Sequence, residues 1–219
     1  MKMLSPSAIL QKCWRWFVDR TKIEPILRAT ITKGALSPMY CLGGLTFLFF
    51  VLLVITGMML GIYYTATPET AYNSLQEIAT NVPYGWLIRG VHFYSANGMI
   101  IASILHMLRV YFTGAYKKPR ELNWIVGVGL GAFTIMAGFT GYVLRWDQEA
   151  VGAAGIGLGI TGSIPQLGPI MTSIVWGKPY EDTLGRFFAF HVWLIPGMLL
   201  ILMFFHFWMI KRHGIARPL

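Results

Sequence analysis

The sequence predicts an all-α membrane protein, a bundle of four transmembrane helices. Only 12% of the 219 residues are charged, whereas soluble domains carry about 25%. Hydrophobic residues make up 55% of the chain, and the mean hydropathy is +0.57. Four charge-free intervals can each supply the ~20 apolar residues that a bilayer-spanning helix needs. We therefore expect spans at about 39–64, 88–110, 122–144 and 187–210.

The segment before the first span, residues 1–36, mixes charged and aromatic side chains. Within it, "KCWRWFVDRTKIEPILRA" combines Trp, Phe and Ile with basic residues, which is typical of an amphipathic helix lying in the membrane interface. A simple solvated arm is the alternative. The segment lacks the continuous apolar stretch of a cleavable signal peptide. We expect an interfacial segment at 1–36 and a four-helix domain at 37–219.

The connection between the third and fourth spans contains a fifth charge-free interval, residues 150–177. This interval holds seven glycines and two prolines in 28 residues, a composition that argues against a helix surrounded by lipid. It therefore predicts a long connection with one or two short helices at the membrane surface.

Basic residues are distributed unequally between the two sides of a four-span topology. Fourteen of the 18 Lys and Arg residues fall in the N-terminal segment, the 109–121 loop and the C-terminal tail, which carries Lys211 and Arg212. The positive-inside rule makes this inner side cytoplasmic or stromal, with both termini on it. The net charge of +9 follows from topology, so we exclude nucleic acid as a partner.

Four of the five histidines lie inside predicted spans, where polar groups are costly and usually functional. His92 and His106 are fourteen residues apart in the second span, so they share a face and lie about 21 Å apart along the axis. His191 and His206 are fifteen apart in the fourth span, within about 60° of a common face.

The second and fourth spans run in the same direction, so the histidines pair at two depths. His92 lies level with His191 near the outer side, and His106 lies level with His206 near the inner side. Facing imidazoles at each depth indicate bis-histidine ligation of two b haems, which transfer electrons because both axial positions are filled. A proton relay or metal-transport site usually adds Asp or Glu at one depth, and no predicted span contains a carboxylate.

Glycines and arginines near the histidines support haem sites. The neighbouring spans carry glycines at the same fourteen-residue interval, which give a flat macrocycle room beside the backbone; these are Gly43, Gly57, Gly127 and Gly141. Ordinary helix packing by small residues is the alternative. Three arginines near the histidines are placed to meet haem propionates, and snorkelling to the interface is compatible with that role; these are Arg89, Arg109 and Arg186.

The chain resembles the cytochrome b6 family from about residue 13 to its C-terminus. The resemblance is carried by "YCLGGLTF", "GWLIRGVHFYSANGMIIASILHMLRVYFTGAYKKPRELNWIVGV", "GFTGYVLRWDQ", "RFFAFHVW" and "HFWMIKRHGIARPL". Members are four-helix dihaem subunits of cytochrome b6f complexes and of related bacterial menaquinol:cytochrome c reductases. The fourteen- and fifteen-residue histidine intervals are similar to those of this family.

The resemblance implies a third cofactor at Cys41. This residue occupies the position that forms one thioether bond to an extra c-type haem in b6-type proteins. Without the family, Cys41 would be interpreted as a small buried hydrophobic residue, because the two cysteines, Cys13 and Cys41, do not indicate a disulfide framework or a zinc site. Cys13 has no such match.

The resemblance also implies a reaction and partners. Trp146 and Asp147 would border an outer quinol-oxidation pocket, where one electron passes to a Rieske iron–sulfur protein. The other passes through the two b haems to an inner quinone, coupled to proton translocation in a Q cycle. Expected partners are a three-helix subunit with the Pro-Glu-Trp-Tyr loop that this chain lacks, a c-type cytochrome, membrane lipid and a second copy of the complex. The chain should be inactive alone.

Two departures from the family pattern affect these expectations. Arg145 stands where the family usually has proline, so we expect a changed end of the third span, with Arg145 holding a propionate or a partner's carboxylate. No acidic residue lies between Glu24 and Cys41, although chloroplast members carry acidic residues there. This difference leaves the inner proton route open, and we expect a bacterial plasma membrane rather than a thylakoid.

Two other functional classes are alternatives. A dihaem membrane anchor of a dehydrogenase or hydrogenase would have one quinone site and no c-type haem, and Cys41 and the Trp146-Asp147 pair argue against it. A channel or scaffold without redox chemistry would require the four histidines to be coincidental.

Overall fold

The computed structural model describes residues 10–12, 14–15, 38–214 and 216. Residues 10–12 and 14–15 are helical, and the rest of the predicted interfacial segment lies outside the described residues. The described residues from Cys41 onward form one compact unit, which contains the sites discussed below.

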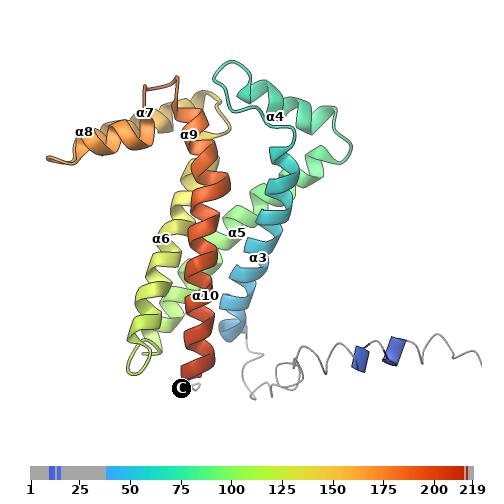
Figure 1. The fold of residues 1–219 in the computed structure, drawn as a ribbon, viewed down its shortest axis with the longest axis vertical. Coiled ribbons are helices and arrows are strands. Elements are labelled where there is room, and N and C mark those ends of the chain that lie inside the picture. Colours follow the sequence, from blue (N-terminus) through green and yellow to red (C-terminus); the bar gives the residue numbers. More distant parts are fainter. Residues whose placement is uncertain (1–9, 13, 16–37, 215, 217–219) are drawn as a thin grey trace, which may run out of the picture. The chain divides into compact units, whose positions relative to one another are not determined.

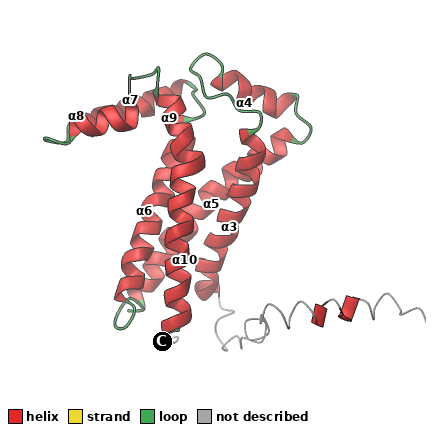
Figure 2. Cartoon of the chain, in the orientation of Figure 1, coloured by secondary structure: helices red, strands yellow, loops and turns green. Residues whose placement is uncertain are grey.

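Four long helical segments run through this unit, and all secondary structure in the described residues is helical (Figure 2). The segments are α3 (Pro38–Gly61), α5 (Gly85–Phe112), α6 (Glu121–Val143), and a continuous run of α9 (Thr183–Ala189), η2 (Phe190–Leu194) and α10 (Ile195–His213). All four are long and apolar enough to cross a membrane. The all-α, four-span prediction is confirmed.

The shorter helices gather at one end of the bundle, away from the C-terminus (Figure 1). They are α4 (Ala71–Thr80), α7 (Gln148–Gly162), α8 (Gly168–Met171) and the π-helix η1 (Thr172–Trp176). We call this the outer end, and the end formed by the 113–120 loop and His213 the inner end. Arg120 joins that loop to the end of α10, because its Nε donates to the Gly214 carbonyl at 3.1 Å.

Helix α7 is longer than the short helices predicted for this connection. It begins at an N-cap, because Asp147 Oδ1 accepts the backbone N–H of Ala150 at 2.9 Å. The glycines of this segment permit close packing: a Cβ at Gly157 would lie 2.9 Å from ring atoms of both Phe139 and Trp176. Glycine therefore allows α7 to lie close against α6 and η1.

Two apolar clusters hold the unit together. At the outer end, Val143, Leu184 and Phe187 are almost fully buried with Trp176, and Tyr64 donates a hydrogen bond to the Leu144 carbonyl at 2.8 Å. The second cluster lies between the two histidine levels and is built on four buried side chains from three helices; these are Phe50, Met99, Ile195 and Leu199. This second cluster, the midplane cluster, separates the two ends of the bundle by apolar side chains.

The fourth span contains a π-turn at its outer histidine. In η2 the N–H of Ile195 bonds to the carbonyl of Phe190, five residues back, which accommodates one residue more than an α-turn. The fifteen residues between His191 and His206 therefore turn the helix about as far as fourteen do in a regular α-helix. The π-turn brings both histidines to one face, as in α5.

Candidate functional site

The four predicted histidines lie inside the bundle as two pairs. The rings of His92 on α5 and His191 on η2 face each other at the outer end, with centroids 6.2 Å apart and planes 66° apart. At the inner end, His106 on α5 lies close enough to His206 on α10 for the two rings to interact electrostatically. All four side chains are half-buried.

Each of the four predicted glycines lies against one of these rings. A Cβ at Gly141 would be 2.6 Å from Cε1 of His191, and one at Gly43 would be 3.1 Å from Cε1 of His106. The remaining pairs are Gly57 with His92, at 3.3 Å, and Gly127 with His206, at 3.6 Å. The glycines therefore give the imidazoles access to the helix backbone; their predicted role in haem clearance stays a prediction.

Two threonines that the sequence analysis missed bind the outer rings. Thr56 Oγ1 lies 2.8 Å from Nδ1 of His92, and Thr140 Oγ1 lies 3.1 Å from Nδ1 of His191. The Ala137 carbonyl also lies 3.1 Å from Nδ1 of His191. A signal was present in the sequence, because a threonine directly precedes each outer glycine, in Thr56-Gly57 and Thr140-Gly141.

The inner end holds most of the buried polar atoms that lack a hydrogen-bond partner in the described part of the chain. These atoms are Nδ1 of His106, Nδ1 of His206, Oδ1 of Asn123 and Nδ1 of His213. Buried polar groups normally have partners. Unlike the outer rings, the inner rings thus have no threonine bonded to Nδ1.

The geometry of the outer pair fits a flat, iron-centred cofactor between the two rings. With the Nδ1 position of His92 and His191 directed at the protein, Nε2 is left for a metal. A metal–imidazole bond is about 2 Å long and a ring centroid lies about 1 Å behind its nitrogen, so two rings on opposite sides of one ion have centroids about 6 Å apart. The observed 6.2 Å agrees.

The outer end carries a cluster of charges at the end of α6. The helix ends at Val143 without a proline, and Trp146 follows in the left-handed region, with φ 51°. Arg145 pairs with Asp147, its Nε donating to Oδ2 at 2.9 Å. The arginine at the usual proline position therefore binds a carboxylate of its own chain.

Asp147 is held in its charged form. Burial opposes its ionisation, but the Ala150 N–H, the Arg145 guanidinium and the positive charge of Arg89 outweigh burial and lower the pKa of Asp147. In turn, the hydrogen bond to Asp147 raises the pKa of Arg145. The turn that joins α6 to α7 is therefore fixed by an ion pair and a helix cap.

The other predicted site residues lie at both ends of the bundle. Arg109 lies near His106 at the inner end, where Lys211 and Arg212 are exposed at the end of α10 and Cys41 is exposed on α3. At the outer end, the positive charge of Arg89 helps to lower the pKa of Asp147. Arg186 donates to the carbonyls of Ser173 and Ile174 and pairs with Asp182.

The fold and site define a class of protein: a helical bundle long and apolar enough to span a membrane, with two pairs of histidines in its interior. A family model described as cytochrome b/b6/petB matches residues 27–214. The chain therefore belongs to the cytochrome b/b6 family.

Individual relatives are similar over nearly the whole chain. A cytochrome b6 of Acaryochloris marina is 40% identical over 96% of this chain and 100% of its own length. The menaquinol:cytochrome c reductase cytochrome b subunit of Geobacillus thermodenitrificans is also 40% identical, with the same coverage. Among solved structures, a chain of a hyperthermophilic respiratory complex III superposes with a TM-score of 0.80 and 31% identity over 93% of this chain. This chain spans 56% of that one.

We expect the substitution Gly141→Ala to abolish haem binding at the outer histidine pair. The added Cβ would lie 2.6 Å from a His191 ring that is already fixed by hydrogen bonds, so the ring must leave its position. The b-haem content of the purified protein, measured as its pyridine haemochrome, should fall by about half because only one of two ring pairs is disturbed. Gly129→Ala is the matched control, since its Cβ would meet only Leu202, at 3.6 Å. Full haem content in Gly141→Ala would contradict a haem site at the outer histidine pair.

We expect Asp147 to make stability depend on acid pH. Its folded-state pKa is lowered, so its contribution is fully present above the unfolded value of about 3.9 and is lost as the pH falls through the folded-state pKa. Asp147→Asn keeps a good N-cap but loses the ion pair. Its Tm should lie below that of the wild type at neutral pH and approach it below about pH 4.

Thermal unfolding in detergent from pH 7 to pH 3, at about one-unit steps, measures this convergence. Glu149→Gln is the control, because the Glu149 side chain is 76% exposed and lies 3.5 Å from Arg145. A Tm difference between the wild type and Asp147→Asn that stays constant with pH would exclude the ion pair as its cause.

Proposed function

We propose that this chain is the haem-bearing subunit of a quinol:electron-acceptor oxidoreductase of the b6f/bc type. In this role it would carry electrons from an outer quinol-oxidation site to the inner side of a membrane, coupled to proton translocation. One observation carries the proposal: two histidine pairs lie at opposite ends of one bundle, and the outer rings are 6.2 Å apart. Relatives named cytochrome b6 and menaquinol:cytochrome c reductase subunit support it.

The four histidines would hold two b haems, one at each end. A bound b haem supplies reversible one-electron chemistry, and ligation by two imidazoles leaves it no open position. Between the pairs, the midplane cluster of Phe50, Met99, Ile195 and Leu199 excludes water. The chain thereby holds two redox sites at fixed depths and keeps the space between them apolar, while the redox chemistry belongs to the cofactor.

Charged side chains at the two ends would neutralise the haem propionates. Arg89 at the outer end and Arg109 at the inner end are half-buried, and each lies three residues from a histidine in the sequence. A carboxylate at either position would find a charge-assisted partner. Arg186 as a third partner stays a prediction, because its guanidinium already binds two carbonyls and Asp182. Lys211 and Arg212 provide positive charge on the inner side.

The substrate would be a lipid-soluble quinol, oxidised beside Trp146 and Asp147. Trp146 is half-buried and its ring lies 6.4 Å from that of Tyr180, which provides aromatic surface next to a fixed carboxylate. We propose a Rieske iron–sulfur protein, a three-helix subunit and a c-type cytochrome as partners, in a complex that contains two copies of each. Both termini would face the cytoplasm of a bacterium.

Cys41 would bind a third haem covalently at the inner end. Its side chain is exposed, and Gly43, two residues further along α3, lies against the inner ligand His106. A thioether at Cys41 would therefore attach a c-type haem close to the inner b haem.

The haem assignment is tested by counting cofactors in the purified complex. We expect two b haems per chain, with one lost in His191→Leu and the other lost in His206→Leu, as measured by pyridine haemochrome and by the α-band spectrum. Because each variant keeps one intact pair, the remaining haem reports that the bundle has folded. A wild-type complex without b haem would exclude the redox function.

The covalent haem has a separate test. We expect the wild-type chain to retain haem on a denaturing gel, and Cys41→Ala to lose that haem stain while keeping both b haems. Cys13→Ala is the matched control and should stain like the wild type. An unstained wild-type band would refute the Cys41 assignment and favour a dihaem membrane anchor.

A further inference from the structure

We infer that Thr56 and Thr140 are positioning residues that hold the outer histidines through Nδ1 and thereby lower the redox potential of the outer haem. The inference rests on the proposed function, because it requires a b haem at each histidine pair. It goes further by assigning the tuning of the outer haem to two hydroxyl groups of this chain.

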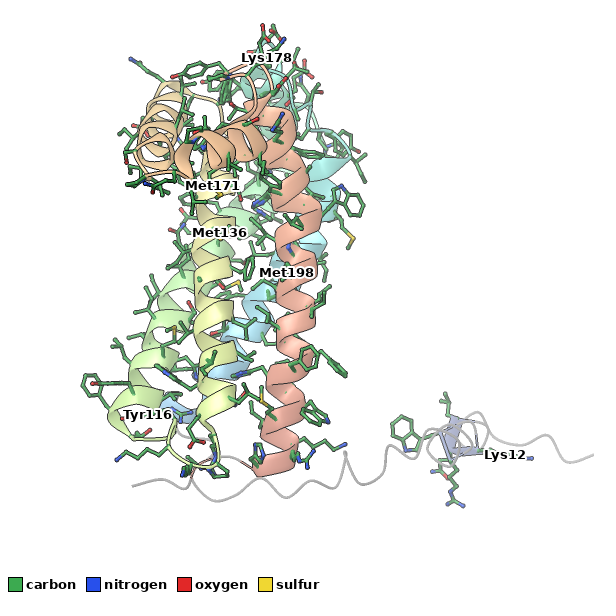
Figure 3. All side chains as sticks on the ribbon, turned by 60° about the vertical axis from the view of Figure 1, so that its left-hand side comes forward. Lys12, Tyr116, Met136, Met171, Lys178 and Met198 are labelled. Carbon is green, nitrogen blue, oxygen red and sulfur yellow. The ribbon has the colours of Figure 1, made fainter. Side chains whose placement is uncertain are left out.

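The second hydrogen bond of each threonine hydroxyl indicates whether the hydroxyl or the ring nitrogen Nδ1 donates. Thr56 donates its hydroxyl hydrogen to the Leu52 carbonyl at 2.6 Å, and Thr140 donates to the Met136 carbonyl at 2.9 Å (Met136 is labelled on α6 in Figure 3). A hydroxyl has one hydrogen and two lone pairs. The oxygen that faces each ring is therefore an acceptor, and Nδ1 of His92 and of His191 carries the hydrogen.

Both threonines occupy sites where this bond is sheltered from water. Thr56 is 7% exposed and Thr140 is 6% exposed. The neighbouring glycine brings each ring close enough for the contact, since a Cβ at Gly141 would collide with His191 and one at Gly57 would crowd His92. The Thr-Gly pair thus works as a unit in which glycine admits the ring and threonine binds it.

An acceptor on Nδ1–H changes the ligand electronically. It fixes the tautomer in which the lone pair of Nε2 faces the metal, and it raises the basicity of the imidazole. A more basic axial ligand stabilises the oxidised iron more than the reduced iron, and hydrogen bonding to ligands is a recognised means of tuning haem potential. Two such bonds at the outer site therefore lower its potential.

The inner site has glycines at the corresponding positions but no threonine hydroxyls beside its rings. The residues that precede Gly43 and Gly127 are Leu42 and Val126. Nδ1 of His106 and of His206 is buried and has no hydrogen-bond partner in the described part of the chain. The backbone of Asn123 lies near the His206 ring. It does not have the geometry of a hydrogen bond to Nδ1.

The two levels therefore differ in the acceptors on Nδ1. The geometry also ranks the two threonines. His191 has a second acceptor, the Ala137 carbonyl at 3.1 Å, so loss of Thr140 should matter less than loss of Thr56.

The test is a redox titration of the α-bands in the intact complex. Thr56→Val keeps the shape of the side chain and removes the hydroxyl, and we expect the outer midpoint potential to rise while the inner potential stays unchanged. Thr140→Val should raise the outer potential by a smaller amount. Thr56→Ser restores the acceptor and should restore the wild-type potential, which a purely steric role of threonine would not predict.

The reverse substitution tests the same idea at the other end. Val126→Thr places a hydroxyl beside His206 at the position equivalent to Thr140, and we expect it to lower the inner potential only. Two threonines that bond only to their own helix provide controls. Thr46→Val on α3 and Thr134→Val on α6 remove hydroxyls that donate to Leu42 and Leu130, and both potentials should stay at wild-type values.

The outcomes separate this inference from the proposed function. If both b haems are present but Thr56→Val and Thr140→Val titrate like the controls, the inference is overturned while the function stands. If Thr56→Val loses the outer haem, the potentials of Thr56→Ser and Val126→Thr still test the inference. An inner potential that does not fall in Val126→Thr contradicts it. Absence of b haem from the wild-type complex refutes the proposed function itself.

Discussion

The cost of placing imidazole rings inside membrane-spanning helices is the constraint on which the rest of this structure depends. Each ring has two nitrogens, and neither finds water at that depth. Four glycines of α3 and α6 therefore stand opposite the four histidines of α5 and the fourth span. The rings reach the neighbouring helix, where hydroxyls and a backbone carbonyl satisfy Nδ1 of the outer pair. Nε2 of the outer pair is then left for a metal.

The apolar packing of the bundle follows from the same arrangement. Between the two histidine levels, the midplane cluster fills the bundle with Phe, Met, Ile and Leu side chains. Met198 on α10 lies in this intermediate stretch of the fourth span (Figure 3). The apolar layer gives the interior a low dielectric constant, in which charges at the two ends are poorly screened from one another. The charged side chains of the four spanning segments accordingly lie beyond the histidine levels, as do Arg145 and Asp147.

Spacing alone could predict much of this fold. Charge-free intervals located all four spans, and the histidine and glycine intervals placed those residues on facing helices. The π-turn at His191 could not be derived, because a fifteen-residue interval is compatible with a rotated ring as well as with a local change of helix type. The threonines were missed since threonine in a helix usually bonds its own backbone, as Thr46 and Thr134 do. The pairing of Arg145 with Asp147 depends on the left-handed turn at Trp146, which a sequence pattern does not reveal.

The repetition of glycines on α3 and α6 has a consequence for how the two ends of the bundle can differ. A scaffold that places a glycine against a histidine ring at each of two depths is nearly symmetric between its ends. A difference between the two sites must then come from individual side chains placed on this repeat, such as Thr140 at one depth and Val126 at the other. A few atoms can thus distinguish two sites that the helices themselves build alike.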